Sequence, residues 1–399
     1  MSVSIAGVGC SLMDYLFTGV DFDGPAFSRY RSRAAGDGGL EPGHLVFAED
    51  LERFSGRSYR SVLEEITGGE SSASRNLGGP SVVALVHAAQ VLAGTDAPVT
   101  FHGVRGDDET GAQLADLLQQ TPLRWERYEQ VPGETPFTHA LSDPDYDDGA
   151  GERCFINRVG VAGDFSAADI PDSFFDHPIA AFGGTALVPT LHAELHLPVT
   201  RAHRGGTLTV INTVYDFLNQ SRHPENPWPL GNSAETYAAT DLLVVDAEEA
   251  RRLSGVEDPR RAMQVFRDAG VGAVAITRGR DPVLAAAGSG RFRELPVTEF
   301  PVSRLVTQEL AGDARSAGDT TGCGDNFVGA VLASIAEQML AGERRIDLAE
   351  AATRGVVAGG YACFFLGGTY LESRPGEKRT RLEPYYRAYR EQADTPTKQ

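Results

Sequence analysis

The chain has 399 residues, of which 41% are hydrophobic and 23% are charged, as expected for one large folded domain or two smaller ones. Its 36 Lys and Arg residues against 55 Asp and Glu residues give a formal net charge of −19, and so acidic a surface repels nucleic-acid phosphates and anionic lipid headgroups. We therefore expect neither a nucleic-acid partner nor a membrane partner. No segment has about eighteen uninterrupted apolar residues, and no basic region precedes the apolar N-terminal stretch, so we expect a cytoplasmic protein.

Short apolar runs bounded by Gly or Asp recur along the chain and are typical of buried strands. They span residues 3–8, 99–104, 179–182, 207–211, 242–245, 273–276 and 282–286. Between them lie helix-length stretches in which apolar residues recur every three to four positions, at 81–92, 111–120, 247–254, 260–269, 325–338 and 348–365. Strands that alternate with helices predict an α/β fold of three layers, with a doubly wound, mostly parallel sheet between helices.

Two regions interrupt this alternation. Residues 22–49 are rich in Gly, Asp and Arg, and residues 135–161 hold strand-like pieces around a turn at 143–151. We expect one domain at 1–390, with insertions near 15–49 and 135–161 that form a small β-lid over one edge of the sheet. Decorative surface loops are the alternative. The polar residues 391–399 are expected to form a flexible C-terminal tail.

The spacing of cysteine and histidine does not indicate a metal centre. His192 and His196 are four residues apart, as two ligands on one helix would be, but no third ligand accompanies them. We expect these two side chains to lie on a solvated helix face. The cysteines form no CxxC pair and lie far apart, so free thiols are expected at Cys10, Cys154, Cys323 and Cys363.

The strongest chemical signal is the run GDTTGCGD at 318–325, which directly precedes a predicted helix. Glycines on either side of a small residue before a helix leave backbone N–H groups unpaired, and the helix dipole adds roughly 0.3–2 kcal/mol of attraction for an anion. A phosphate suits this site. Asp325 would compete with the phosphate unless it accepts a proton from a substrate hydroxyl. The alternative is that Asp325 only caps the helix and the glycines only form a tight turn.

This run resembles the C-terminal signature D-T-x-G-A-G-D of the PfkB, or ribokinase-like, family of carbohydrate and nucleoside kinases, with Cys323 in the usual Ala position. Further segments resemble the same family in the same order. They are GVGCSLMD at 7–14, Gly78-Gly79 before a helix, GVRGDDETG at 103–111, DAEE at 246–249 and TRG at 277–279. Several ordered matches over nearly the whole chain are far more specific than any one of them.

The resemblance implies a ribokinase-like fold and an ATP-dependent kinase that phosphorylates a hydroxyl of a sugar or sugar-like molecule. A nucleoside kinase and a non-catalytic sugar or nucleotide sensor of the same fold are the alternatives. Asp325 is expected to be the general base, and the N–H groups of Gly322, Cys323 and Gly324 to form the anion hole. The expected acceptor-binding residues are Asp14, Gly78 and Gly79, together with Arg158 on the lid, whose alternative is a solvated surface position.

The resemblance also implies ATP and Mg²⁺ as cofactors. The residues expected at ATP are Asp246, Glu249, Thr277, Gly279, Asp319, Thr320, Gly322 and Gly324. Glu249 is expected to orient Mg²⁺ through water, and Asp319 to help hold a monovalent cation such as K⁺. Three residues stand where relatives carry Asn, namely Cys10, Val83 and Asp246, and we expect these changes to redirect substrate choice. Both a monomer and a homodimer are compatible with the lid.

Overall fold

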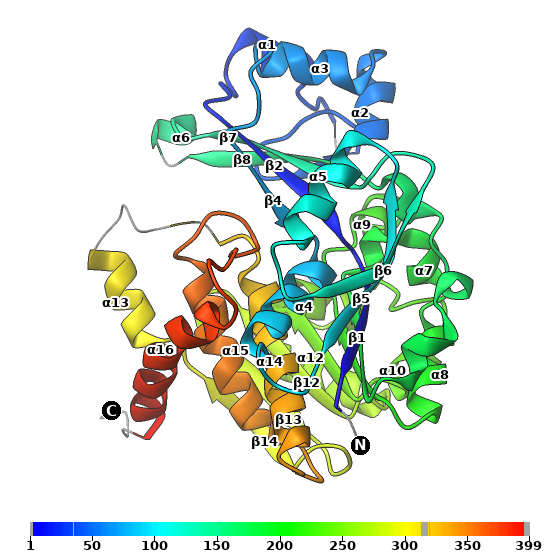
Figure 1. Cartoon of the computed structure of the whole chain (residues 1–399). Coiled ribbons are helices and arrows are strands. Elements are labelled where there is room, and N and C mark those ends of the chain that lie inside the picture. The colour runs from blue at the N-terminus through cyan, green and yellow to red at the C-terminus, as the bar shows by residue number, and fades with distance from the viewer. Residues whose placement is uncertain (1–2, 35, 150, 313–317, 319, 395–399) are drawn as a thin grey trace.

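The computed structural model describes residues 3–34, 36–149, 151–312, 318 and 320–394 (Figure 1). Within this part of the chain, the larger sheet has nine strands in the order β14-β13-β12-β11-β10-β9-β1-β5-β6. Their bounds are β1 (Ile5–Gly9), β5 (Val99–Gly106), β6 (Arg124–Val131), β9 (Ile179–Gly183), β10 (Leu208–Asn212), β11 (Leu242–Asp246), β12 (Ala273–Arg278), β13 (Asp281–Ala287) and β14 (Leu295–Phe300). The strands from β6 to β12 pair in parallel, and only β13 and β14 are antiparallel, which confirms the predicted sheet.

Both faces of this sheet are buried, because successive strand residues point to opposite sides. Val210 of β10 belongs to one hydrophobic core and its neighbour Ile211 to the other. The first core is covered by α4 (Pro80–Val91), α14 (Cys323–Leu340), α15 (Leu348–Ala362) and α16 (Glu377–Asp394). The second core is covered by α7 (Pro189–Ala193), α8 (His196–Arg204), α11 (Ala247–Ser254) and α12 (Pro259–Asp268). The three predicted layers are therefore present.

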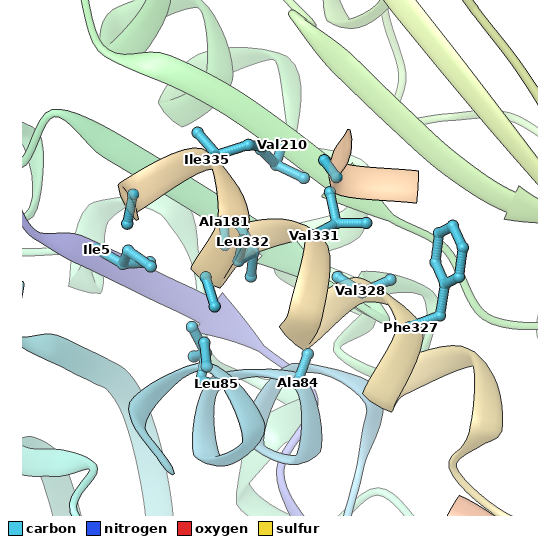
Figure 2. Packing of buried hydrophobic residues seen from close by; sticks show 14 of the residues in the cluster. Ile5, Ala84, Leu85, Ala181, Val210, Phe327, Val328, Val331, Leu332 and Ile335 are labelled. Carbon is cyan, nitrogen blue, oxygen red and sulfur yellow. The ribbon is translucent and has the colours of Figure 1, made fainter. Parts of the chain in front are cut away.

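Helix α14 lies deep in the first core, and every residue from Asn326 to Ala336 is buried. Figure 2 shows its apolar side chains against Ala84 and Leu85 of α4 and against Ile5 of β1. Burial of each large aliphatic side chain contributes roughly 1.5–3 kcal/mol. This packing fixes the position of the N-terminus of α14, where the candidate anion site begins.

A second sheet lies above the larger one in Figure 1 and has the order β3-β8-β7-β2-β4. Its elements are β2 (Leu12–Thr18), β3 (Leu45–Phe47), β4 (Ser74–Gly78), β7 (Phe137–Asp143) and β8 (Glu152–Arg158), with α1 (Pro25–Tyr30), α2 (Ala48–Ser55) and α3 (Tyr59–Ile66) packed beside them on a separate core. We call this unit the lid. It extends beyond the two ranges expected from the sequence, because α2, α3 and β4 belong to it as well.

The remaining helices connect these units. They are α5 (Glu109–Leu118), α6 (Tyr146–Gly149), α9 (Phe217–Arg222), α10 (Glu235–Ala238), α13 (Arg304–Gly312) and the 3₁₀ turns at Gly160–Gly163, Ala167–Asp169, Asp172–Asp176 and Thr185–Leu187. Helix α16 runs to Asp394, past the expected domain end at 390, and residues 395–399 of the expected tail lie outside the described residues. None of the helices in the described part is long and apolar enough to cross a membrane.

The expectation for the two histidines was wrong. Helix α7 ends before α8 begins at His196, so His192 and His196 do not share a helix. His192 is buried: its Nε2 donates to the carbonyl of Pro229 at 3.2 Å, and its Nδ1 accepts from the hydroxyl of Thr185 at 2.9 Å. Among the described residues, no group of three His, Cys, Asp or Glu side chains is placed to hold a metal ion.

Candidate active site

Residues 320–324, which we call the anion loop, lead directly into α14. Gly322 is the N-cap residue and has a left-handed backbone with φ 74°, which favours glycine. The first helical hydrogen bond is donated by the N–H of Asn326 to the carbonyl of Gly322 at 2.8 Å. Within the described part of the chain, the N–H groups of Gly324 and Asp325 donate to no backbone carbonyl, and a side chain added at Gly324 would meet open space. This helix end therefore offers donors to an anion.

The N–H of Cys323 differs from its neighbours, because it donates to the carbonyl of Thr320 at 3.3 Å. This long bond closes a turn within the anion loop. Thr320 itself is exposed, and its predicted partner at ATP, Asp319, lies outside the described residues. Of the three N–H groups expected to form the anion hole, the one at Gly324 is thus the most accessible.

Asp325 lies in the first turn of α14, and its carboxylate makes no hydrogen bond within the described part of the chain. It therefore does not cap the helix. The side chain keeps some exposed surface, but the surrounding protein displaces enough water to raise its pKa to about 7. A carboxylate that titrates near neutrality and has no internal partner suits a general base.

The charges of Asp14 on β2 and Asp325 on α14 both act on the same buried thiol, that of Cys10. Cys10 is 2% exposed, and burial followed by the charges of Asp14 and Asp325 raises its pKa far above the ordinary value. The structure thus brings together two of the carboxylates that the sequence singled out, although 311 positions separate them in the chain.

Gly78 makes room for the Asp14 carboxylate. The two residues lie on the paired strands β4 and β2, and a Cβ atom added at Gly78 would lie 2.1 Å from Oδ2 of Asp14. Gly79 is the next residue and forms the N-cap of α4. Gly78 and Gly79 therefore lie close to Asp14, and all three residues are predicted from the sequence to bind the acceptor.

A cavity of about 120 Å³ opens between the lid and the anion loop. The strand registers place Asp14, Asn76 and Thr138 side by side on β2, β4 and β7, so one face of the lid sheet lines this cavity. Its lining residues are Asp14, Tyr15, Leu16, Ser74, Arg75, Asn76, Thr138, Ala140, Arg153, Phe155, Thr321, Leu366 and Gly367. Along the lid sheet, the apolar row of Leu16, Ala140 and Phe155 therefore lies between the polar row of Asp14 and Thr138 and the row that carries Arg153.

The arginines that line this cavity are Arg75 and Arg153, whereas the predicted Arg158 is engaged elsewhere. Arg158 is paired with the carboxylates of Glu49, Glu52 and Glu134, at 3.2, 3.4 and 3.3 Å, and it does not line the cavity. Arg153 lies on the same strand, β8, and its Nη1 donates to Oγ1 of Thr321 in the anion loop at 3.3 Å. Arg153 and Arg158 are five positions apart on β8, so alternation along the strand points them to opposite faces of the lid sheet.

The carboxyl ends of β11 and β12 carry the residues predicted for ATP and Mg²⁺. Asp246 lies opposite Thr277 in the strand register, and Gly279 follows with φ 59°. Asp246 and Glu249 form a capping box on α11, and Oε2 of Glu249 also accepts from the hydroxyl of Thr213 at 2.6 Å. Burial and the nearby Asp246 carboxylate raise the pKa of Glu249 to about 8.

The carboxylates of Asp246 and Glu249 supply only part of the ligand set that Mg²⁺ requires. The exposed Asp246 carboxylate is the kind of hard oxygen ligand that Mg²⁺ takes, usually beside water and phosphate oxygens. Glu249 already uses one oxygen in hydrogen bonds, so its role toward the metal would pass through water. An ATP phosphate chain that runs from this edge to the anion loop would supply the remaining ligands.

Two polar residues behind the anion loop, Asn326 and Lys378, were not among the predicted site residues. Asn326 donates from Nδ2 to the carbonyls of Gly322 and Gly368, and Lys378 of α16 donates to its Oδ1. Asn326 directly follows the recognised run, but its sequence position alone does not indicate these contacts. Val83, where relatives carry Asn, is buried against Gly368.

Two thiols meet beside the anion loop. Sγ of Cys323 lies 3.5 Å from Sγ of Cys363, the C-cap residue of α15. The carbonyl of Cys363 also accepts the N–H of Gly318 at 2.7 Å, so the segment before the loop is anchored to the same residue. All four cysteines are free thiols, as expected.

Comparison with known proteins places this site in a family. Residues 46–371 match the model of the pfkB family of carbohydrate kinases, which is more than half of the chain. The chain belongs to the pfkB family. Membership makes it a carbohydrate or nucleoside kinase. No curated protein sequence matches the chain.

Solved structures share the fold of this pfkB protein. An adenosine kinase from Schistosoma mansoni in complex with 2-fluoroadenosine has 18% sequence identity and a TM-score of 0.67, with 92% of this chain and 96% of the other covered. A probable sugar kinase from Rhizobium etli CFN 42 has 16% identity and a TM-score of 0.68, with 96% and 99% covered. A ribokinase from Thermotoga maritima has 16% identity and a TM-score of 0.60, with 96% and 99% covered. The ribokinase-like fold is therefore that of this chain.

Proposed function

We propose that this pfkB protein transfers the γ-phosphoryl group of ATP to a hydroxyl of a sugar or sugar-like molecule held in the cavity under the lid. The observation that carries the proposal is a cavity lined both by Asp14 of the lid and by Thr321 of the anion loop, the loop that leads into Asp325 on α14. Phosphoryl transfer needs positioned reactants and neutralised charge more than covalent chemistry from the protein.

In this mechanism, the acceptor hydroxyl binds Asp14 and points toward Asp325. Asp325 takes the hydroxyl proton as the oxygen attacks the γ-phosphorus, and a pKa of about 7 suits that transfer near neutral pH. The N–H groups of residues 322–324 stabilise the charge on the transferred group. Arg153 reaches the same loop from the lid through Thr321 and orders it from the acceptor side.

The nucleotide lies across the carboxyl ends of β11 and β12. Asp246, Thr277, Gly279 and Thr320 would contact its phosphates, and Asp246, with Glu249 through water, would hold Mg²⁺. When bound, Mg²⁺ neutralises phosphate charge. Asp319 remains our assignment for a monovalent cation such as K⁺. We also propose that the protein acts as a monomer or homodimer.

A nucleoside is the second candidate acceptor. Leu16, Ala140 and Phe155 form an apolar row on the lid face of the cavity, and Leu366 also lines it. A nucleobase buries more apolar surface than a sugar alone, so this row favours an acceptor with a ribose end and a base end. A non-catalytic sensor is disfavoured, since a binder gains nothing from the Asp325 carboxylate facing a phosphate.

The test is the release of ADP from ATP with Mg²⁺ across a panel of sugars, polyols and nucleosides. We expect robust turnover on at least one sugar-like hydroxyl compound, and the ratio of kcat/KM values separates sugars from nucleosides. Binding of ATP and an acceptor without turnover on any compound would contradict the kinase mechanism and favour the sensor.

A further inference from the structure

A buried polar network lies directly behind the anion loop. The side chains of Asn326, Lys378 and His87 are 0%, 1% and 0% exposed, and they come from α14, α16 and α4. Nζ of Lys378 and Nδ1 of His87 each lie 2.8 Å from Oδ1 of Asn326. Nothing in the phosphoryl-transfer steps described above uses these three groups.

The Asn326 amide can take only one orientation. Its Nδ2 lies 2.8 Å from the carbonyl oxygen of Gly322 and 2.9 Å from that of Gly368, and two carbonyls require two N–H donors. Its Oδ1 then accepts from Lys378 and from the Nδ1–H of His87. All four hydrogen-bonding positions of the amide are used, so a rotated amide would leave buried groups unpaired at a cost of about 1–3 kcal/mol each.

This amide joins the two segments that shape the site. Gly322 is the N-cap of α14, and Gly368 belongs to the segment 366–369, whose carbonyls at Leu366 and Thr369 accept from the side chain of Asn76 on the lid. A Cβ atom added at Gly322 would lie 2.5 Å from Cα of Gly368, so the two segments are in close contact. Asn326 sits between them and donates to both.

Lys378 supplies the charge in this network. Its Nζ lies 5.6 Å from the ring centroid of Phe365, and its backbone N–H donates to Oε1 of Glu372 at 2.6 Å. Burial lowers the pKa of the ammonium to about 7, with the Glu372 charge acting in the opposite direction. A buried ammonium lowers the stability of the fold unless hydrogen bonds or opposite charges compensate for its lost hydration. Here it attracts Oδ1 and thereby points Nδ2 of Asn326 at the loop carbonyls.

We propose that Lys378 and Asn326 are positioning residues, which hold the anion loop and the segment 366–369 in the geometry that phosphoryl transfer requires. The inference rests on the proposed function only in naming the reaction. Neither residue touches a substrate. Without the ammonium, Oδ1 of Asn326 keeps only the His87 donor, so the amide is held less firmly against the Gly322 carbonyl and the N–H groups of the first turn of α14 become more mobile. A shift of about 1 Å at such a site costs up to roughly a hundredfold in rate.

The experiment uses the full chain with Lys378→Met, which keeps the length of the side chain but removes its charge, and Asn326→Asp, which keeps its shape but replaces the donor by an oxygen. Tyr389→Phe is the matched control. Tyr389 is also buried on α16, and its hydroxyl donates to the carbonyl of Pro301 at 2.7 Å, away from the loop. Three quantities are measured: thermal unfolding, hydrogen exchange of the amides at 320–326, and kcat with the KM for ATP.

We expect Lys378→Met and Asn326→Asp to speed loop exchange at least about tenfold and to lower kcat at least about tenfold, with the KM for ATP within about threefold of wild type. Tyr389→Phe should lower only the unfolding temperature. The proposal would be overturned if Lys378→Met showed the same loop exchange and kcat as the wild type. It would also be overturned if Tyr389→Phe changed loop exchange and kcat as much as Lys378→Met does. If Lys378→Met does not fold, Asn326→Asp decides by the same criteria. If the wild type turns over no acceptor, the proposed function fails, while loop exchange still decides this inference.

Discussion

Sγ of Cys323 in the anion loop lies 3.5 Å from Sγ of Cys363 at the end of α15, whereas the Cys10 thiol is buried. The first two thiols are partly exposed and the third is not. Thiolate is the reactive form of cysteine, and access limits its reaction with a reagent. The loop thiol therefore reports on whatever binds beside it.

We expect Cys323 to be alkylated faster than Cys10 in the free protein, and to be protected by ATP with Mg²⁺. Peptide mapping after brief exposure to iodoacetamide, with and without nucleotide, measures both rates. Cys154, which is buried in the lid, serves as an internal control that nucleotide should not affect. Labelling of Cys323 that nucleotide does not slow would mean that the phosphates bind elsewhere.

Asp325→Asn should lower kcat about a hundredfold or more while leaving ATP binding nearly unchanged, because the amide keeps the shape but cannot take the hydroxyl proton. Initial rates and equilibrium binding of ATP separate the two effects. Turnover close to that of the wild type would show that another group is the base.

The same substitution should change how stability depends on pH. The pKa of Asp325 rises from 3.8 to about 7 on folding, so between these values the folded chain holds a proton that the unfolded chain has released. Its contribution to the free energy of unfolding is therefore present below about pH 4 and is lost as pH rises to about 7. Relative to wild type, Asp325→Asn should gain stability across this window and stay constant above it. Urea unfolding at about pH 4, 6 and 8 measures the difference, and a difference that does not vary with pH would contradict the shift.

Gly78→Ala should mimic Asp14→Ala. The new methyl group would overlap Oδ2 of Asp14 and displace the carboxylate, so both variants should raise the KM for the acceptor far more than that for ATP. Gly163→Ala is a suitable control, since its added Cβ would approach only Cγ1 of Val159, at 3.5 Å. Equal changes in both KM values for Asp14→Ala would indicate a structural role for Asp14.

Most of the fold could be predicted from apolar periodicity. Each predicted strand and helix overlaps one in the structure, because buried strands and helix faces leave a pattern in the sequence. The edge strand β6 was missed because most of its residues are exposed, so it has no continuous apolar run. The lid was recognised, but α2, α3 and β4 were not assigned to it, since pairing between β2 and β4 joins segments separated by a long insertion.

The candidate site was predicted less completely. Asp14, Gly78 and Asp325 could be identified because the runs around them resemble a family signature. Arg153 and Lys378 could not, because each matters only through a contact that the fold creates, with Thr321 168 residues away and with Asn326 52 residues away. No local pattern distinguishes a buried lysine in α16 from the exposed basic residues beside it.

The placement of Lys378 also bears on how the protein acquires activity during synthesis. The site is built from residues between Asp14 on β2 and Lys378 on α16, so it draws on almost the entire length of the chain. A nascent chain that has already formed the lid and the central strands still lacks the ammonium behind the anion loop. Under the role proposed for Lys378, the anion loop would thus reach its working geometry only after α16 has been made and packed against α4 and α14.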